Sequence, residues 1–154
     1  MLDVRQFREL VIRPALKVID LYSPAAEQLL LGTALQESRL QYLKQLGLGP
    51  ALGPFQMEPF THDDIWENFL AYKPELSKKI ALLMVVSPDE SDALPGNLYY
   101  AAAMCRVHYY RRPEALPAED DIQAQAEYWK KHYNTPLGHG TVDQYMDNWE
   151  RFAA

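Results

Sequence analysis

The chain has 154 residues and a formal net charge of −6, with 48% apolar and 23% charged side chains. This length suits one domain with a true core, and the composition excludes a disordered chain. The acidic balance argues against a nucleic-acid-binding protein, which needs a basic face. No stretch reaches the roughly 20 apolar residues of a membrane span, so no membrane partner is expected.

The N-terminal segment is predicted to form an amphipathic helix from about residue 3 to residue 21. Pro14 should kink or split it. The apolar side chains that recur at helical spacing are Val4, Phe7, Leu10, Val11, Ala15, Val18 and Ile19. We therefore expect residues 1–22 to be a helical extension packed on the domain. No apolar run of the secretory type opens the chain, so no signal peptide is predicted.

The central helix is predicted to begin at Ser23, an N-cap residue followed by a proline in the first helical position. One face is marked by residues three or four apart, namely Ala26, Leu30, Thr33, Ala34 and Glu37. Leucines on the opposite flank predict a helix that is covered on most sides. It either ends near Ser38 or continues to Leu46, where Gly47 would stop it.

Further helices are predicted over residues 61–73, 74–86, 96–112, 118–133 and 141–152. Capping-box patterns at residues 61–64 and 141–144 mark two of the starts. Residues 87–96 and 113–117 are rich in proline, which predicts surface connections. No period-2 alternation is long enough to indicate a strand. The prediction is a compact, single all-α domain over residues 1–154, with six to eight helices and any sheet limited to a small hairpin.

Glu37 is the leading candidate for a catalytic residue. A carboxyl group at the end of an apolar stripe is expected to be partly buried, which raises its pKa towards the range of a general acid. A helix that ends near Ser38 would disfavour an anion there, so stability alone does not explain the glutamate. The alternative is a solvated residue or an ion-pair partner of Arg39.

The cysteine and the histidines are weaker candidates for a catalytic or metal-binding site. Cys105 is the only cysteine, lies in an apolar helical stretch and is interpreted as part of the core. The histidines, His62, His108, His132 and His139, lack the close spacing of metal ligands and are interpreted as surface or helix-end residues. We predict no metal and no cofactor.

Three short motifs follow one another along the chain. They are Glu37-Ser38, Gly53-Pro54-Phe55-Gln56-Met57 and Tyr133-Asn134. In this order and helical context the chain resembles the lysozyme-like lytic transglycosylases, the soluble-transglycosylase and goose-type lysozyme group, over about residues 23–140. The resemblance implies a lysozyme-like fold and cleavage of the MurNAc–GlcNAc bond of peptidoglycan.

The same resemblance implies a role for each motif residue. Glu37 would be the acid that protonates the glycosidic oxygen. Ser38 and Gln56 would orient the sugar's N-acetyl group or Glu37, with Met57 beside them in the substrate-binding segment. Tyr133 and Asn134 would line the opposite wall.

The chain also departs from the family pattern. Arg39 replaces a usual glycine, Pro54-Phe55 replaces a small apolar pair, and the loop after Asn134 lacks the usual Ala-Gly. These changes bear on substrate fit and activity. They keep open an alternative in which the protein is a non-enzymatic phage virion component that retains the fold.

Glycoside cleavage ordinarily uses two carboxyl groups. The candidates for a second are Glu58, Asp63 and Asp64, although the two aspartates also suit a helix start. A lone glutamate favours the transglycosylase route over hydrolysis. The expected partners are peptidoglycan glycan strands and, for a phage protein, other virion proteins. Such a protein would be made in the cytoplasm and carried in the virion or delivered to the periplasm by phage machinery.

Overall fold

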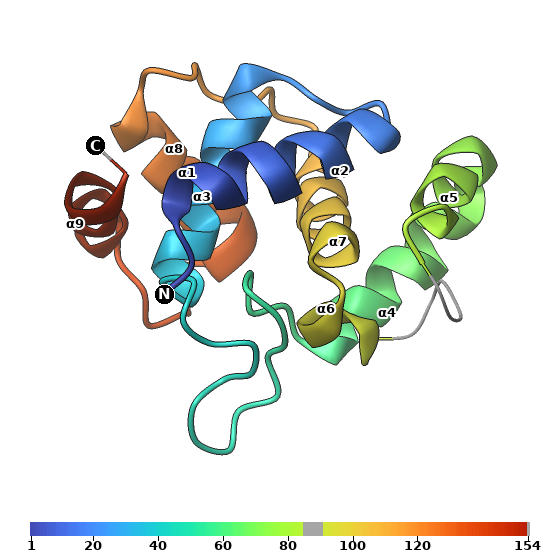
Figure 1. The fold of residues 1–154 in the computed structure, drawn as a ribbon, viewed down its shortest axis with the longest axis horizontal. Coiled ribbons are helices and arrows are strands. Elements are labelled where there is room, and N and C mark those ends of the chain that lie inside the picture. The colour runs from blue at the N-terminus through green and yellow to red at the C-terminus, as the bar shows by residue number, and fades with distance from the viewer. Residues whose placement is uncertain (85–90, 154) are drawn as a thin grey trace.

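The computed structural model describes residues 1–84 and 91–153 (Figure 1). In chain order its helices are α1 Val4–Phe7, α2 Arg13–Val18, α3 Pro24–Glu37, α4 Pro59–Asn68, α5 Pro74–Ala81, α6 Ala93–Gly96, α7 Leu98–Tyr110, α8 Ile122–Trp129 and α9 Val142–Phe152. Two π-helical turns, Arg8–Ile12 and Lys130–Asn134, and one 3-10 turn, Leu70–Tyr72, adjoin them. Across these described residues there is no strand, which confirms the all-α prediction.

The small hairpin that the prediction allowed is reduced to isolated contacts. In the loop between α3 and α4, Leu52 forms antiparallel bridges with Lys44 and with Met57. Of the helices described, none is both long enough and apolar enough to cross a membrane.

The N-terminal segment is helical, but its buried face differs from the predicted one. Leu10 and Val18 are 59% and 41% exposed, whereas Ile12 and Leu16 are fully buried. The cause is the π-helical turn Arg8–Ile12, which widens the helix and rotates the residues that follow. The turn ends two residues before Pro14, which has no N–H to bond the fourth preceding carbonyl. The break expected at Pro14 is therefore absorbed by one widened turn.

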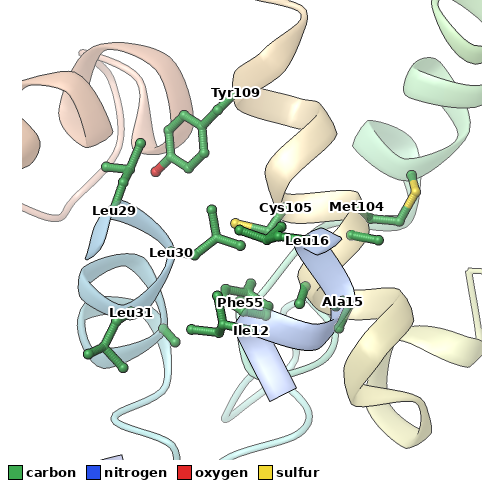
Figure 2. Close-up of a cluster of buried hydrophobic side chains, with 14 of the residues drawn as sticks. Ile12, Ala15, Leu16, Leu29, Leu30, Leu31, Phe55, Met104, Cys105 and Tyr109 are labelled. Atoms are coloured by element: carbon green, nitrogen blue, oxygen red, sulfur yellow. The ribbon is translucent and has the colours of Figure 1, made fainter. Parts of the chain in front are cut away.

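Helix α3 begins and is covered as predicted. Ser23 caps it by accepting a hydrogen bond from the amide of Ala26 at 3.0 Å, and Pro24 occupies the first position. Every side chain from Leu29 to Leu35 is buried. Figure 2 shows leucines of α3 meeting the N-terminal segment, α7 and Phe55 in one apolar cluster.

A buried ion pair ties the N-terminal segment to α3. Glu27 is only 5% exposed, and its two carboxylate oxygens accept from Arg13 at 2.8 and 3.0 Å. Arg8 approaches the same carboxylate at 3.9 Å. Residues that were predicted to be an extension packed on the domain thus contribute both charge and apolar side chains to its interior.

Several predicted boundaries are wrong. Helix α4 begins at Pro59 rather than at the predicted capping box, because a proline in the first turn needs no N–H partner. Helix α5 ends at Ala81, and part of the predicted loop forms α6. Helix α8 begins after Asp121, whose side chain accepts from the amide of Ala124. The predicted capping box at Thr141 is confirmed. Predictions for residues 85–90 lie outside the described residues.

The packing of α3 on α9 depends on Gly32. A Cβ atom on this residue would lie 1.9 Å from the hydroxyl oxygen of Tyr145 on α9. We expect Gly32→Ala to lower the free energy of unfolding by about 1–3 kcal/mol, as overpacking does. Urea denaturation measures this. Gly96→Ala is the matched control, because a Cβ atom there meets nothing within 4 Å. Equal losses in the two variants would contradict the assignment of a tight contact at Gly32.

Candidate active site

A cleft of about 550 Å³ opens beside the C-terminal end of α3. Five of the six predicted site residues line it: Glu37, Gln56, Met57, Tyr133 and Asn134. The sixth, Ser38, does not. A larger hollow of about 730 Å³, between residues 1–13 and the end of α9, contains none of them. The predicted catalytic and substrate-binding residues therefore assign the candidate site to the smaller cleft.

Glu37 is the last residue of α3 and is held by one neutral donor. Its Oε1 accepts a hydrogen bond of 2.9 Å from Nε1 of Trp129, a fully buried residue of α8. Burial raises the pKa of Glu37 to about 7, and the indole hydrogen bond partly opposes this rise. Among the described residues, no cation forms an ion pair with this carboxyl group, so Arg39 is not its partner.

The end of α3 exposes Glu37 to the cleft because the chain turns sharply there. Arg39 and Leu40 have positive φ angles of 52° and 54°, which take the backbone out of the helix. The predicted continuation to Leu46 is therefore wrong. Ser38 is buried at this turn, and its hydroxyl group donates to the carbonyl oxygen of Pro54 at 2.6 Å, with the carbonyl oxygen of Ala34 also within reach at 3.2 Å. It ties the helix end to the loop.

The predicted opposite wall comes from the π-helical turn Lys130–Asn134. Tyr133 donates its hydroxyl hydrogen to the carbonyl oxygen of Phe55 at 2.7 Å, which joins this wall to the loop between α3 and α4. Lys130 binds Oδ1 of Asn134 at 2.6 Å and the carbonyl oxygens of Gly138 and Gly140 at 2.8 and 2.6 Å. All three acceptors are neutral. One ammonium group thus fixes the loop after Asn134.

Gln56 and Met57 reach the cleft from the loop before α4. Gln56 has a positive φ of 49°, and its side-chain amide donates to the carbonyl oxygen of Gly53 at 2.8 Å. Met57 exchanges two backbone hydrogen bonds with Leu52. Gly53 has a φ of +78°, and a Cβ atom on it would lie 2.6 Å from the carbonyl oxygen of Leu94. The loop therefore requires glycine at this position.

The three candidates for a second carboxylate have different surroundings. Glu58 is exposed and lines the cleft. Asp63 binds Nδ1 of His62 at 2.8 Å. Asp64 binds Arg111 at 2.6 Å, and the hydrogen bond from Arg111 lowers the pKa of Asp64. Neither aspartate lines the cleft, so only Glu58 remains near Glu37.

Two cleft residues were not identified from the sequence. Trp129 belongs to none of the three motifs. A buried indole N–H needs an acceptor, and that requirement is the signal that could have linked it to Glu37. His108 lines the cleft as well. His62, His108 and His132 lie near helix ends, as one of the two predicted alternatives has it, but they are not surface residues, since they are 0%, 6% and 7% exposed. Each has a hydrogen-bonding or ion-pair partner that makes burial tolerable.

In residues 1–84 and 91–153, no group of three or more His, Cys, Asp or Glu side chains could hold a metal ion. Comparisons with protein-family models, curated proteins and solved structures find no match to this chain.

The hydrogen bond from Trp129 should control the pKa of Glu37. Because the indole N–H stabilises the carboxylate form, we expect Trp129→Phe to raise the pKa of Glu37 by about one unit. A ¹³C-carboxyl NMR titration measures this, with the resonance assigned by its loss in Glu37→Gln. Trp66→Phe is the matched control, since it removes an indole N–H bond of 2.8 Å to Tyr100. An equal shift in both variants would refute the direct role of Trp129.

The raised pKa also has a consequence for stability. The carboxyl group has a pKa of about 7 in the folded protein against 4.5 ordinarily, so folding favours its protonated form. Its contribution to stability is then complete below pH 4.5 and is lost as the pH rises to about 7. Relative to wild type, Glu37→Gln should gain roughly 2–3 kcal/mol between these limits. Urea denaturation at a series of pH values checks this. A difference that does not change with pH would contradict it.

Proposed function

We propose that this protein is a peptidoglycan-cleaving enzyme, a lytic transglycosylase or muramidase that acts on the MurNAc–GlcNAc bond. The observation that carries the proposal is Glu37, a largely buried carboxyl group with a pKa of about 7 at the edge of a cleft of about 550 Å³. A general acid works best when its pKa lies near the working pH.

The proposed reaction uses the two protonation states of Glu37 in turn. The protonated carboxyl group gives its proton to the glycosidic oxygen as the bond to the sugar breaks. Trp129 is a donor to Oε1, so the proton leaves from Oε2. The carboxylate then accepts the proton of the sugar's own hydroxyl group, which attacks the same carbon and leaves an anhydro end. Glu37 is protonated again when the cycle closes.

Transglycosylation is favoured over hydrolysis by the surroundings of the other carboxylates. Inverting hydrolysis needs a second carboxylate to activate water, and retaining hydrolysis needs one as a nucleophile. Asp63 and Asp64 are bound to His62 and Arg111 outside the cleft. Glu58 is exposed at the rim. Within residues 1–84 and 91–153 no hydrogen bond orients its carboxylate, and only its backbone carbonyl accepts one, from the amide of His62.

The second candidate is a non-enzymatic virion component. The observation that favours it is the net charge of −6, which provides no general attraction to an anionic wall. The departures at Arg39 and Pro54-Phe55 support it less than the sequence indicated, because none of these residues lines the cleft, whereas the loop after Asn134 does line it. Under this second proposal the partners are other phage virion proteins, and under the first the substrate is the glycan strand.

Loss of the acid should abolish activity. We expect purified peptidoglycan to be cleared by the wild type and Glu37→Gln to be slower by roughly 10²- to 10⁴-fold, the range of general acid–base catalysis. Wild-type activity should fall above a pH of about 7 as Glu37 loses its proton. Turbidity measures both effects.

Glu58→Gln is the matched control, because it neutralises the other carboxylate of the cleft. Its activity should persist, and mass spectrometry should find anhydro ends in the products. Inactive Glu58→Gln with hydrolysed ends would instead indicate a two-carboxylate hydrolase. No clearing by the wild type would favour the virion component.

A further inference from the structure

His108 is a buried cleft residue that the proposed mechanism does not use. It lies on α7 and is 6% exposed, and its ring stands edge-on to the ring of Tyr133 with 4.9 Å between centroids. Both residues line the same cleft as Glu37. A buried imidazole at the wall of a cleft is placed to present a hydrogen-bonding atom to a ligand.

The surroundings of His108 determine which nitrogen carries the hydrogen. Nη2 of Arg111 lies 3.2 Å from Nδ1 of His108, and a guanidinium group can only donate. Nδ1 is therefore the acceptor, and the hydrogen of the neutral ring is on Nε2. Asp64 holds Arg111 in place at 2.6 Å.

The imidazole also stays neutral. Burial and then the positive charges of Arg111 and Arg112, with a smaller effect of His132, together lower the pKa of His108 to about 3, although Asp64 opposes them. The ring is thus uncharged at any pH at which the protein would work, and Nε2–H is a permanent neutral donor.

This donor has no partner within the described part of the protein. No hydrogen bond to Nε2 of His108 is formed by residues 1–84 or 91–153. The fully buried side-chain atoms there that lack a partner belong to Gln28, Arg111, Arg112 and Gln125. Nε2 of His108 also lacks a partner but is not among them, so it is not fully buried. Since His108 lines the cleft, its free donor is accessible from the cleft.

We propose that His108 is a substrate-binding residue whose Nε2–H donates to the carbonyl oxygen of a sugar N-acetyl group. The proposal rests on the glycan-cleaving function proposed above. A neutral donor suits a neutral acceptor, and the carboxyl groups of Glu37 and Glu58 on the same cleft disfavour an anionic one. An amide carbonyl is the neutral acceptor that distinguishes an N-acetylated sugar from one that carries a hydroxyl group.

The test compares two neutral oligosaccharides, chitotetraose with N-acetyl groups and cellotetraose without them. Binding is measured by calorimetry in the Glu37→Gln background, which prevents turnover. His108→Phe keeps a ring but removes the donor, and His108→Gln keeps an N–H donor at the position of Nε2. We expect His108→Phe to weaken chitotetraose binding about three- to tenfold, and His108→Gln to restore most of it. Cellotetraose binding should be unchanged in both.

The outcomes separate this inference from the proposed function. Equal chitotetraose affinity in His108→Phe and its background overturns the inference, and Glu37-dependent clearing of peptidoglycan would still support the enzyme. An equal loss for both sugars overturns the N-acetyl assignment, as would an absence of chitotetraose binding. If His108→Phe fails to fold, ¹⁵N NMR of the Glu37→Gln protein decides. The Nε2–H resonance of His108 should shift with chitotetraose and not with cellotetraose, and the absence of that difference overturns the inference.

Discussion

The hydrogen bond between the Trp129 indole and the Glu37 carboxyl group is the interaction on which the site depends. The molecule has two carboxyl groups on α3 that are largely removed from water, and they are stabilised differently. Glu27 accepts a bidentate hydrogen bond from the charged guanidinium group of Arg13. Glu37 has only a neutral donor on one oxygen. Glu37 can gain and lose a proton near neutral pH, because its pKa is about 7. The ion pair of Glu27 joins α3 to α2.

Glu27 lies in the first turn of α3 and Glu37 is its last residue, so the helix holds the two carboxyl groups apart. Helix α3 is surrounded by the N-terminal segment, α7, α8 and α9, so its end has little freedom to move. The turn after Ser38 releases the chain into a loop that returns to the cleft at Gln56. The hydroxyl groups of Ser38 and Tyr133 bind the carbonyl oxygens of Pro54 and Phe55, which anchors that loop from two sides. Polar side chains therefore shape the cleft even where they do not line it.

The sequence was sufficient for local features and insufficient for those that depend on distant partners. The Ser23 cap, the buried face of α3 and the Thr141 capping box follow from residues near in the chain, and all three are present. The exposure of Leu10 was not foreseeable from spacing, because one π-helical turn rotates the face. Trp129 and Glu37 are 92 positions apart. No periodic pattern in the sequence indicates their pairing. Nor does any pattern indicate that His108 lines a cleft whose other residues come from distant segments.

Lys130 places a positive charge beside the cleft loop of a chain whose net charge is −6. Its ammonium group is bound by three uncharged oxygens, so those contacts orient the positive charge without cancelling it. In physiological salt the field of a charge decays over about 8 Å, so the potential at a point on the surface depends on the nearest charges more than on the total. The loop after Asn134, which borders the cleft, is therefore more positive in potential than the net charge of the chain indicates.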